Sequence, residues 1–327
     1  MPDELQRIAA RYAAFAAEEA RGYSEIYERL TLAVAGSRDL LAFIASLPDD
    51  RRQPNLFLGA VRHVRGVPES ADHLAEIVRR DHARIRAVML SRTTQTNEPG
   101  RCAVLLPVLA GLPQPLALIE VGASAGLCLL PDRYGYDFGV WRIEPAAATV
   151  RTRPPVFACE ATGAVPLPRA VPQIVWRCGL DLNPLDPRSA DDMRWLETLV
   201  WPEQAGRAQR LRAAIDIARL DAPRIVKGDL LDDLEALMAA APRQATLVVF
   251  HTAVVAYVAS QAARDRFAAM MLGSNAVWIS NEAANVFPAF AATVPARPSR
   301  RRFLLAMNGK PLAWTGPHGQ SIDWIGA

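Results

Sequence analysis

The sequence is short of several residue types that would identify a class of protein at once. Four cysteines and five histidines are scattered over 327 residues. No two cysteines stand in a C-x-x-C spacing, so neither a zinc site nor a disulfide scaffold is predicted. Lysine occurs only at Lys227 and Lys310, and the formal net charge is +3. A charge this small gives no reason to expect a nucleic-acid or membrane partner.

Long apolar runs are also missing. The longest run is shorter than the ~20 apolar residues that cross a bilayer. The first residues, Met1-Pro-Asp-Glu4, do not begin the basic and then apolar pattern of a secretion signal. Because the cysteines show no pairing pattern either, we expect a cytoplasmic protein with free thiols. The apolar content, 51%, is sufficient for a sizeable core in one large domain or two.

One stretch combines an apolar run with a turn of small residues. Leu116–Ile119 is followed by Gly122, Ser124 and Gly126, after which Leu127–Leu130 begins a second apolar run. This order predicts a buried strand, a tight turn and the start of a helix. Small residues at such a turn let the backbone approach a ligand, and a helix N-terminus offers N–H groups to it.

Two enzyme classes use a turn of this kind. Glu120-x-Gly122-x-Ser124-x-Gly126 is similar to the first motif of class I methyltransferases that use S-adenosylmethionine, with Ser124 in place of the usual middle glycine. Gly122-x-Ser124-x-Gly126 also fits the nucleophile elbow of α/β-hydrolases. A dinucleotide fingerprint fits less well, because it needs glycine at position 124 and a small residue at position 127, where the chain has Ser124 and Leu127. A plain turn without a ligand is the alternative to all three.

Helical and extended patterns divide the chain into two parts. The first 90 residues show helical spacing of apolar residues and no clear strand. Beyond residue 102, apolar strands alternate with helices, and Asn308-Gly309 predicts a closing hairpin. We therefore predict an α/β fold with a doubly wound, mostly parallel, methyltransferase-like Rossmann sheet. A helical cap domain is expected over 1–105, and a sheet domain over 106–327 with an insertion at about 131–172.

Acidic residues end the next two predicted strands after the turn. Asp181 follows one apolar run, and Asp229 follows the run Arg224–Gly228. In the methyltransferase interpretation Asp181 accepts from the ribose hydroxyls and Asp229 from the adenine amine, because a carboxylate can accept two hydrogen bonds from a diol. The predicted cofactor site consists of Glu120, Gly122, Ser124, Gly126, Asp181 and Asp229.

Polar residues end the fourth and fifth predicted strands, at His251 and Thr252 and at Asn281 and Glu282. Ligands of such sheets bind beyond the carboxyl ends of the strands, so these residues are predicted to form an acceptor pocket. His251, with an ordinary pKa of about 6.5, is the predicted catalytic proton acceptor, and Glu282 orients or replaces it. A polar loop is expected to close over the pocket. The predicted substrate-binding residues are Gln95, Asn97, Glu98, Thr252 and Asn281.

Seven motifs spread over the chain resemble one bacterial family, catalogued as domain of unknown function 2332. They are Gln53-Pro-Asn-Leu, Thr94-Gln-Thr-Asn-Glu98, Glu120-Val-Gly-Ala-Ser-Ala-Gly-Leu127, Gly179-Leu-Asp-Leu-Asn-Pro184, Trp201-Pro-Glu-Gln204, Val249-Phe-His-Thr252 and Ser280-Asn-Glu282. The resemblance covers almost the whole chain and implies no established activity. The similarity to class I methyltransferases is confined to the region from about residue 102 onward.

The predicted function is methyl transfer from S-adenosylmethionine to a small molecule, without a metal, nucleic acid or membrane. Such a reaction depends on holding the nucleophile in line with the methyl group. It needs a base only where the acceptor must lose a proton. One alternative is a Ser124 hydrolase, with Asp229 and then His251 or His318 in a permitted order. Another is a non-catalytic protein that binds a nucleotide-like ligand. A nucleic-acid methyltransferase rests only on the arginines within Arg297–Arg302.

Overall fold

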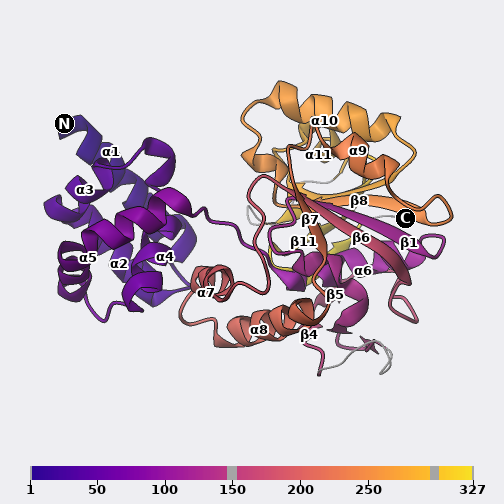
Figure 1. Ribbon diagram of the computed structural model, residues 1–327, viewed down its shortest axis with the longest axis horizontal. Helices are drawn as coiled ribbons and strands as arrows, with labels where there is room; N and C mark the ends of the chain where they lie inside the picture. The colour runs from indigo at the N-terminus through magenta and orange to yellow at the C-terminus, as the bar shows by residue number, and fades with distance from the viewer. Residues whose placement is uncertain (1, 146–152, 295–301, 326–327) are drawn as a thin grey trace. The chain divides into compact units, whose positions relative to one another are not determined.

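The computed structural model describes residues 2–145, 153–294 and 302–325. Within these ranges the chain forms two compact units (Figure 1). The first is built from Met1–Thr96 together with Ala190–Gln209, and the second from Asn97–Ser189 together with Arg210–Ala327. The boundary predicted at residue 105 lies later in the chain than the division between Thr96 and Asn97, and the return of Ala190–Gln209 to the helical unit was not predicted.

The first unit is helical. Three of its helices follow directly after capping serines, Ser24, Ser37 and Ser70. Each serine hydroxyl accepts a backbone N–H from three residues further on. Such caps satisfy a donor that the first helical turn would otherwise leave unpaired. The helices are α1 (Pro2–Phe15), α2 (Glu25–Gly36), α3 (Arg38–Ala45), α4 (Pro54–Arg65), α5 (Ala71–Ser91) and α7 (Ala190–Leu199).

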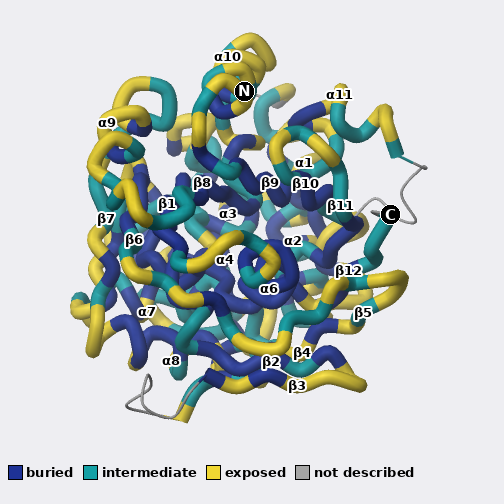
Figure 2. Tube along the Cα trace, turned by 90° about the vertical axis from the view of Figure 1, so that its right-hand side faces the viewer, coloured by how far each residue is buried: buried dark blue, intermediate teal, exposed yellow. Residues whose placement is uncertain are grey.

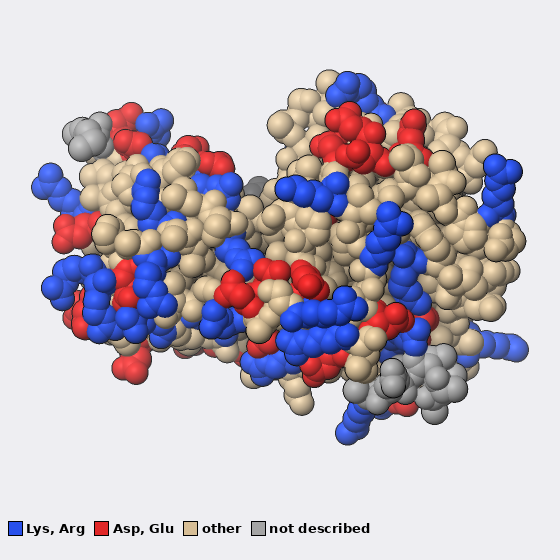
Figure 3. All heavy atoms as spheres, in the orientation of Figure 1, with Lys and Arg blue, Asp and Glu red and all other residues tan. Residues whose placement is uncertain are grey.

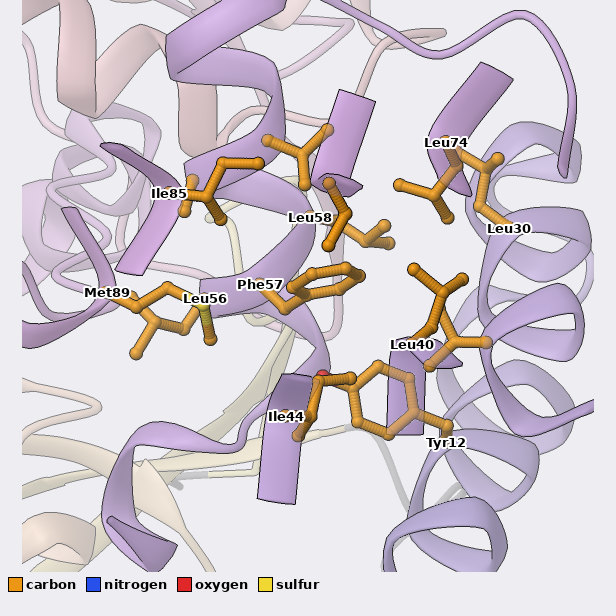
Figure 4. Close-up of a cluster of buried hydrophobic side chains, with 14 of the residues drawn as sticks. Tyr12, Leu30, Leu40, Ile44, Leu56, Phe57, Leu58, Leu74, Ile85 and Met89 are labelled. Carbon is orange, nitrogen blue, oxygen red and sulfur yellow. The ribbon is translucent and has the colours of Figure 1, made fainter. Parts of the chain in front are cut away.

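A single apolar core holds these helices together. Trp195 of α7 belongs to it although about a hundred residues separate α7 from α5 in the sequence. A Cβ added at Gly59 of α4 would lie 3.3 Å from the Trp195 ring, so the glycine allows this close packing. The indole N–H donates to the Thr93 carbonyl at 3.0 Å. Figure 4 shows the centre of this core, with Tyr12, Leu30, Leu40, Ile44, Leu56, Phe57, Leu58, Leu74, Ile85 and Met89 labelled.

The second unit is built on a nine-stranded sheet with the order β5-β12-β11-β10-β9-β8-β1-β6-β7. The strands from β7 to β9 in this order are parallel, and β10 and β11 form the predicted hairpin at Asn308-Gly309. The bounds are β1 (Leu116–Val121), β5 (Glu160–Thr162), β6 (Ile174–Asp181), β7 (Arg224–Lys227), β8 (Thr246–Thr252), β9 (Val277–Ala283), β10 (Phe303–Met307), β11 (Lys310–Thr315) and β12 (Ser321–Trp324). The predicted α/β fold, with helices preceding a mostly parallel sheet, is confirmed.

The parallel strands reverse their order beside β1. Across the sheet the parallel strands lie in the order β7-β6-β1-β8-β9. Numbered as they occur in the chain, this order is 3-2-1-4-5. The chain adds β6 and β7 on one side of β1 and then crosses over to add β8 and β9 on the other side. This is the arrangement of doubly wound sheets, whose ligands bind beyond the carboxyl ends of the strands at the point of reversal. A ligand site is therefore expected at the carboxyl ends of β1, β6 and β8.

Helices cover both faces of the sheet. Figure 1 shows α9 (Leu234–Ala239), α10 (Gln261–Gly273) and α11 (Pro288–Ala291) on one face and α6 (Cys102–Gly111) on the other. Every side chain from Cys102 to Leu109 is buried, as the dark tube of α6 in Figure 2 shows. A helix that is apolar on all sides needs cover on all sides. Among the described residues, no helix is both long and apolar enough to cross a membrane.

The connection from β1 to β6 differs from the expected helix. Leu127–Leu129 forms only a turn of 3₁₀-helix, and Pro131–Arg133 forms another. Proline at 131 cannot continue an α-helix that started at Leu127, because its ring would meet the carbonyl four residues earlier. The predicted insertion then contributes a separate three-stranded sheet, β3-β2-β4, made of β2 (Gly135–Asp137), β3 (Arg142–Ile143) and β4 (Val156–Ala158).

Candidate functional site at the carboxyl ends of the strands

The glycine-rich turn after β1 has a left-handed backbone at three positions. Gly122, Ser124 and Gly126 have φ values of 72°, 52° and 74°. Positive φ costs glycine nothing and costs serine about 1–2 kcal/mol. The turn is fixed to the neighbouring strand because the Gly122 N–H donates to the Leu180 carbonyl at 2.7 Å.

Protein side chains occupy the space that the two glycines leave open. A Cβ at Gly122 would collide with the Val254 side chain, which follows β8. A Cβ at Gly126 would lie 2.9 Å from Ile225 and 3.2 Å from Pro223. In this conformation the glycines therefore serve the packing of chain against chain, not the approach of the backbone to a ligand.

Asp181 ties the glycine-rich turn to the end of β6. Its Oδ2 accepts the Ser124 N–H at 2.7 Å, and its Oδ1 accepts the Asn183 N–H at 2.7 Å. Asn97 fixes the far end of the turn, because its Oδ1 accepts the Leu127 N–H at 3.0 Å. The structure thus brings Ser124 and Asp181 of the predicted cofactor site to the same turn as Asn97, which was predicted to bind the substrate.

Asp229 lies beyond the next strand, two residues after the end of β7, and is half-buried. Its Oδ1 accepts the Leu231 N–H at 2.7 Å, and its own N–H donates to Asp233 Oδ2 at 2.7 Å. Both contacts belong to the turn that leads into α9. The carboxylate is thus held by local hydrogen bonds at the same edge of the sheet as Asp181.

Neighbouring residues at the ends of β8 and β9 point to opposite faces of the sheet, as successive strand residues must. His251 contacts Phe267 of α10, whereas Thr252 accepts from Arg101 beside α6. Glu282 contacts His251, whereas Asn281 Oδ1 accepts from Thr315 of β11. The four residues predicted to line one acceptor pocket therefore form two separate groups.

His251 lies within the core on the α10 face. The ring is 0% exposed and contacts the rings of Phe267, Trp278 and Phe287. The Trp278 indole N–H donates to Nε2 at 3.0 Å, so Nε2 is an acceptor and the proton lies on Nδ1, which is 2.7 Å from Glu282 Oε1. Both ring nitrogens are therefore engaged, and the predicted role of His251 as proton acceptor does not fit this geometry. Glu282 Oε1 contacts Nδ1 of this ring, and the predicted role of Glu282 as orienter or base stays a prediction.

A second group of polar side chains lies on the α6 face. Glu120 is 2% exposed, and its Oε2 has no hydrogen-bond partner. Burial raises the pKa of Glu120 well above its ordinary value, with further increases from Cys128 and Asp181 that Arg101 opposes. The Arg101 Nη1 donates to the Thr252 carbonyl at 2.9 Å. Glu120 is therefore a buried acid beneath the turn and is not presented at the rim.

The remaining predicted substrate residues have local roles. Glu98 is buried, and its Oε1 accepts the Gly100 N–H at 3.0 Å at the start of the 3₁₀ turn before α6. Gln95 belongs to the first unit, and its N–H donates to the Thr93 carbonyl at 2.9 Å. The sequence missed Arg101, Val254 and Trp278. Arg101 could have been identified from the sequence, because it is a charged residue directly before the apolar run that begins at Cys102.

S-adenosylmethionine fits this site only in part. Asp181 ends β6 and Asp229 follows β7, where carboxylates can accept from a ribose and an adenine amine, although both oxygens of Asp181 already accept backbone N–H groups. The surface of Gly122, in contrast, is covered by Val254. A hydrolase fits less well: Ser124 shares the positive φ of a strained elbow, but its Oγ is buried and has no hydrogen-bond partner. A nucleophilic serine requires an adjacent base.

The face of the molecule in Figure 3 has no extended patch of only positive or only negative charge. Basic and acidic side chains are interspersed there, in keeping with the small net charge. The nucleic-acid alternative rested on the arginines within 297–302. Those at 297, 300 and 301 lie outside the described residues, and Arg302 is paired with Asp323 at 2.9 Å. Within residues 2–145, 153–294 and 302–325, no group of three or more His, Cys, Asp or Glu side chains could hold a metal ion.

The sheet order and the turn at its point of reversal define a Rossmann-like α/β protein. The family model described as "Uncharacterized protein conserved in bacteria (DUF2332)" matches residues 9–324, and the chain belongs to this family. No curated protein and no solved structure matches the chain.

Proposed function

We propose that the protein binds S-adenosylmethionine at the carboxyl ends of β1, β6 and β7 and transfers its methyl group to a small molecule. One observation carries the proposal. Two carboxylates, Asp181 and Asp229, stand beyond adjacent parallel strands, and the first of them hydrogen-bonds to the glycine-rich turn at the point where the strand order reverses. Ligands of doubly wound sheets bind at this point.

Binding in this mode requires the segment from Ala253 to Val258 to move away from Gly122. The segment is held at the rim by three backbone contacts: Ala253 N–H donates to the Asn281 carbonyl at 3.0 Å, and Val254 and Val255 donate to Glu282 Oε1 at 2.8 and 3.0 Å. Ala253 has a φ of 55°, a strained value for a residue with a side chain. Strain of this kind lowers the cost of an alternative conformation.

The chain's contribution to such a reaction is positioning. S-adenosylmethionine supplies the activated methyl group, and Asp181 and Asp229 orient the adenosine part. His251 has no nitrogen available for a substrate proton. We therefore propose an acceptor that is nucleophilic without deprotonation by this histidine, so that alignment accounts for most of the rate.

Isothermal titration tests the proposal, with S-adenosylmethionine, S-adenosylhomocysteine and NAD as ligands. We expect saturable binding of the first two. Losing a charge-assisted hydrogen bond costs ~1.5–3 kcal/mol, so Asp181→Asn should weaken binding about tenfold or more.

The matched control is Asp186→Asn, because exposed Asp186 also accepts a backbone N–H, from Arg188 at 2.9 Å, but lies outside the strand end. Urea denaturation of both variants separates loss of binding from loss of the turn. No heat with the wild-type protein at millimolar ligand would refute the proposed function.

A further inference from the structure

A buried guanidinium group lies at the carboxyl end of β8, on the face of the sheet that α6 covers. Arg101, directly before α6, is 7% exposed, and its Nη1 donates to the Thr252 carbonyl at 2.9 Å. Its Nε donates to the Pro317 carbonyl at 2.9 Å, and its Cζ lies 6.0 Å from the centre of the Phe303 ring. Contacts from three separate segments therefore hold this positive charge beside the end of β8.

The charge of Arg101 has no carboxylate partner within residues 2–145, 153–294 and 302–325. Its hydrogen bonds go to uncharged oxygens of Thr252 and Pro317. Nη2 makes no hydrogen bond to a described residue, and this atom is not fully buried. Glu120 lies on the same face, but burial raises its pKa well above the ordinary value, which favours the neutral acid. Since burying an unpaired charge is unfavourable, Arg101 is a candidate for binding an anionic group.

Arg101 and the proposed cofactor site lie along one row of strand ends. Neighbouring strands in this row are β7, β6, β1 and β8 (Figure 1). Asp229 follows β7, Asp181 ends β6, the glycine-rich turn follows β1, and Arg101 contacts the end of β8. Because strands are about 4.8 Å apart, the two carboxylates at one end of the row are separated from the guanidinium by roughly 10–14 Å.

A ligand that lies across this row needs a matching polarity. Its end at β6 and β7 must carry hydroxyl and amine donors for the two aspartates, and its end at β8 must carry an anion for Arg101. S-adenosylmethionine has this polarity, because its adenosine and its α-carboxylate lie at opposite ends of the molecule. Hydrogen bonds between a guanidinium and a carboxylate are shorter and stronger than those between neutral groups.

We propose that Arg101 binds the α-carboxylate of the amino-acid part of S-adenosylmethionine through Nη2. This assignment rests on the proposed function and identifies the end of the ligand that faces β8. The contact to Pro317 holds the guanidinium independently of the Ala253–Val258 segment, which has to move away from Gly122. Arg101 thereby selects nucleosides that carry an amino-acid group over nucleosides that lack one.

Isothermal titration with two ligands that differ only in the carboxylate tests the assignment. They are S-adenosylhomocysteine and its decarboxylated form, S-adenosyl-3-thiopropylamine. The wild-type protein should bind the first about tenfold or more tightly than the second, which is the size of one charge-assisted hydrogen bond. Equal affinity overturns the assignment of Arg101 and leaves the proposed function standing. Absence of binding by both ligands at millimolar concentration refutes the proposed function, and the assignment with it.

The variant Arg101→Gln identifies the residue. It removes the positive charge, so the ratio between the affinities for the two ligands should fall to about one. A structural effect alone would weaken the binding of both ligands by the same factor, because both carry the same adenosine part. An unchanged ratio therefore overturns the proposal, whatever the absolute affinities.

The matched control is Arg52→Gln in the helical unit. Arg52 also donates to two backbone carbonyls, those of Leu47 at 2.7 Å and Ala45 at 2.8 Å. This variant should retain the wild-type ratio, and a ratio of about one would overturn the assignment to Arg101. If Arg101→Gln does not fold, the crystal structure of the wild-type protein with S-adenosylhomocysteine decides: a ligand carboxylate that does not contact the Arg101 guanidinium overturns the proposal.

Discussion

Both units contain buried carboxylates, and two of them, Asp81 and Glu282, are compensated in different ways. Asp81 in α5 is 6% exposed and receives two hydrogen bonds from Arg65, at 2.7 Å each, with Arg80 at 3.3 Å and Arg84 at 3.5 Å. Its pKa is lowered to about 2, chiefly by the hydrogen bond from Arg65. The chain itself supplies every cation that this carboxylate needs.

Glu282 in the second unit receives backbone and histidine N–H donors instead, and one of its oxygens has no partner. A carboxylate that the chain neutralises completely fixes local structure, as Asp81 fixes the interrupted helix of α5. A buried carboxylate that the described residues leave incomplete is a candidate for a ligand. This difference is why we look for a ligand at the rim of the sheet before the helical unit.

The largest effect should come from removing the histidine that joins Glu282 to the aromatic core. His251→Ala leaves a cavity among three rings and deprives both Trp278 N–H and Glu282 of a partner. We expect a loss of about 3–5 kcal/mol in the free energy of unfolding, measured by urea denaturation. His82→Ala, at an exposed position in α5, is the control. A loss below about 1 kcal/mol would show that the dyad does not organise the second unit.

A smaller effect tests the segment that Glu282 holds over the glycine-rich turn. Gly122→Ala should destabilise the protein more than Gly139→Ala, by about 1–3 kcal/mol. Both glycines have positive φ, 72° and 80°, but only Gly122 has a neighbour, Val254, within 4 Å of the new Cβ. Combining Gly122→Ala with Val254→Ala should recover most of that difference. Equal destabilisation by the two alanines would mean that Val254 does not cover Gly122.

The smallest effect concerns Asp81 and appears only in acid. Its pKa is about 2 in the folded protein, against about 3.9 in an unfolded chain. The stability that the ionised carboxylate contributes is therefore present above about pH 4 and is lost as the pH falls toward 2. Asp81→Asn should remove this part of the pH dependence from urea denaturation between pH 4 and pH 2. Exposed Asp72→Asn on the same helix should retain it; the same profile for both variants would contradict the assignment.

Regular features of the fold could be predicted from the sequence. Apolar runs ending in Asp181, His251 and Asn281 marked parallel strands, and Asn308-Gly309 marked the hairpin, because these patterns follow from local backbone chemistry. The 3₁₀ turns after Gly126 did not follow from the apolar run Leu127–Leu130 alone, because Pro131 interrupts the helix that this run would otherwise form. Trp195 joined the helical core through a contact that no local pattern encodes.

The candidate site could be predicted only as a list of positions along strands. His251 and Thr252 were assigned to one pocket because both follow the same apolar run, yet successive strand residues face opposite sides. Applying that period to β8 and β9 would have separated His251 and Glu282 from Thr252 and Asn281. The hydrogen-bond partners of the two His251 nitrogens are Trp278 and Glu282, which come from the neighbouring strand β9. The orientations of the indole and the carboxylate could not be predicted from the sequence of either strand alone.

The most direct test of the central claim is a crystal structure of the protein grown with S-adenosylhomocysteine. The account predicts the ligand beyond β1 and β6, with its ribose hydroxyls donating to Asp181, its adenine amine near Asp229, and Val254 displaced from Gly122. Density for the ligand at another place, or an unmoved Val254 over an unliganded turn at saturating ligand, would contradict it.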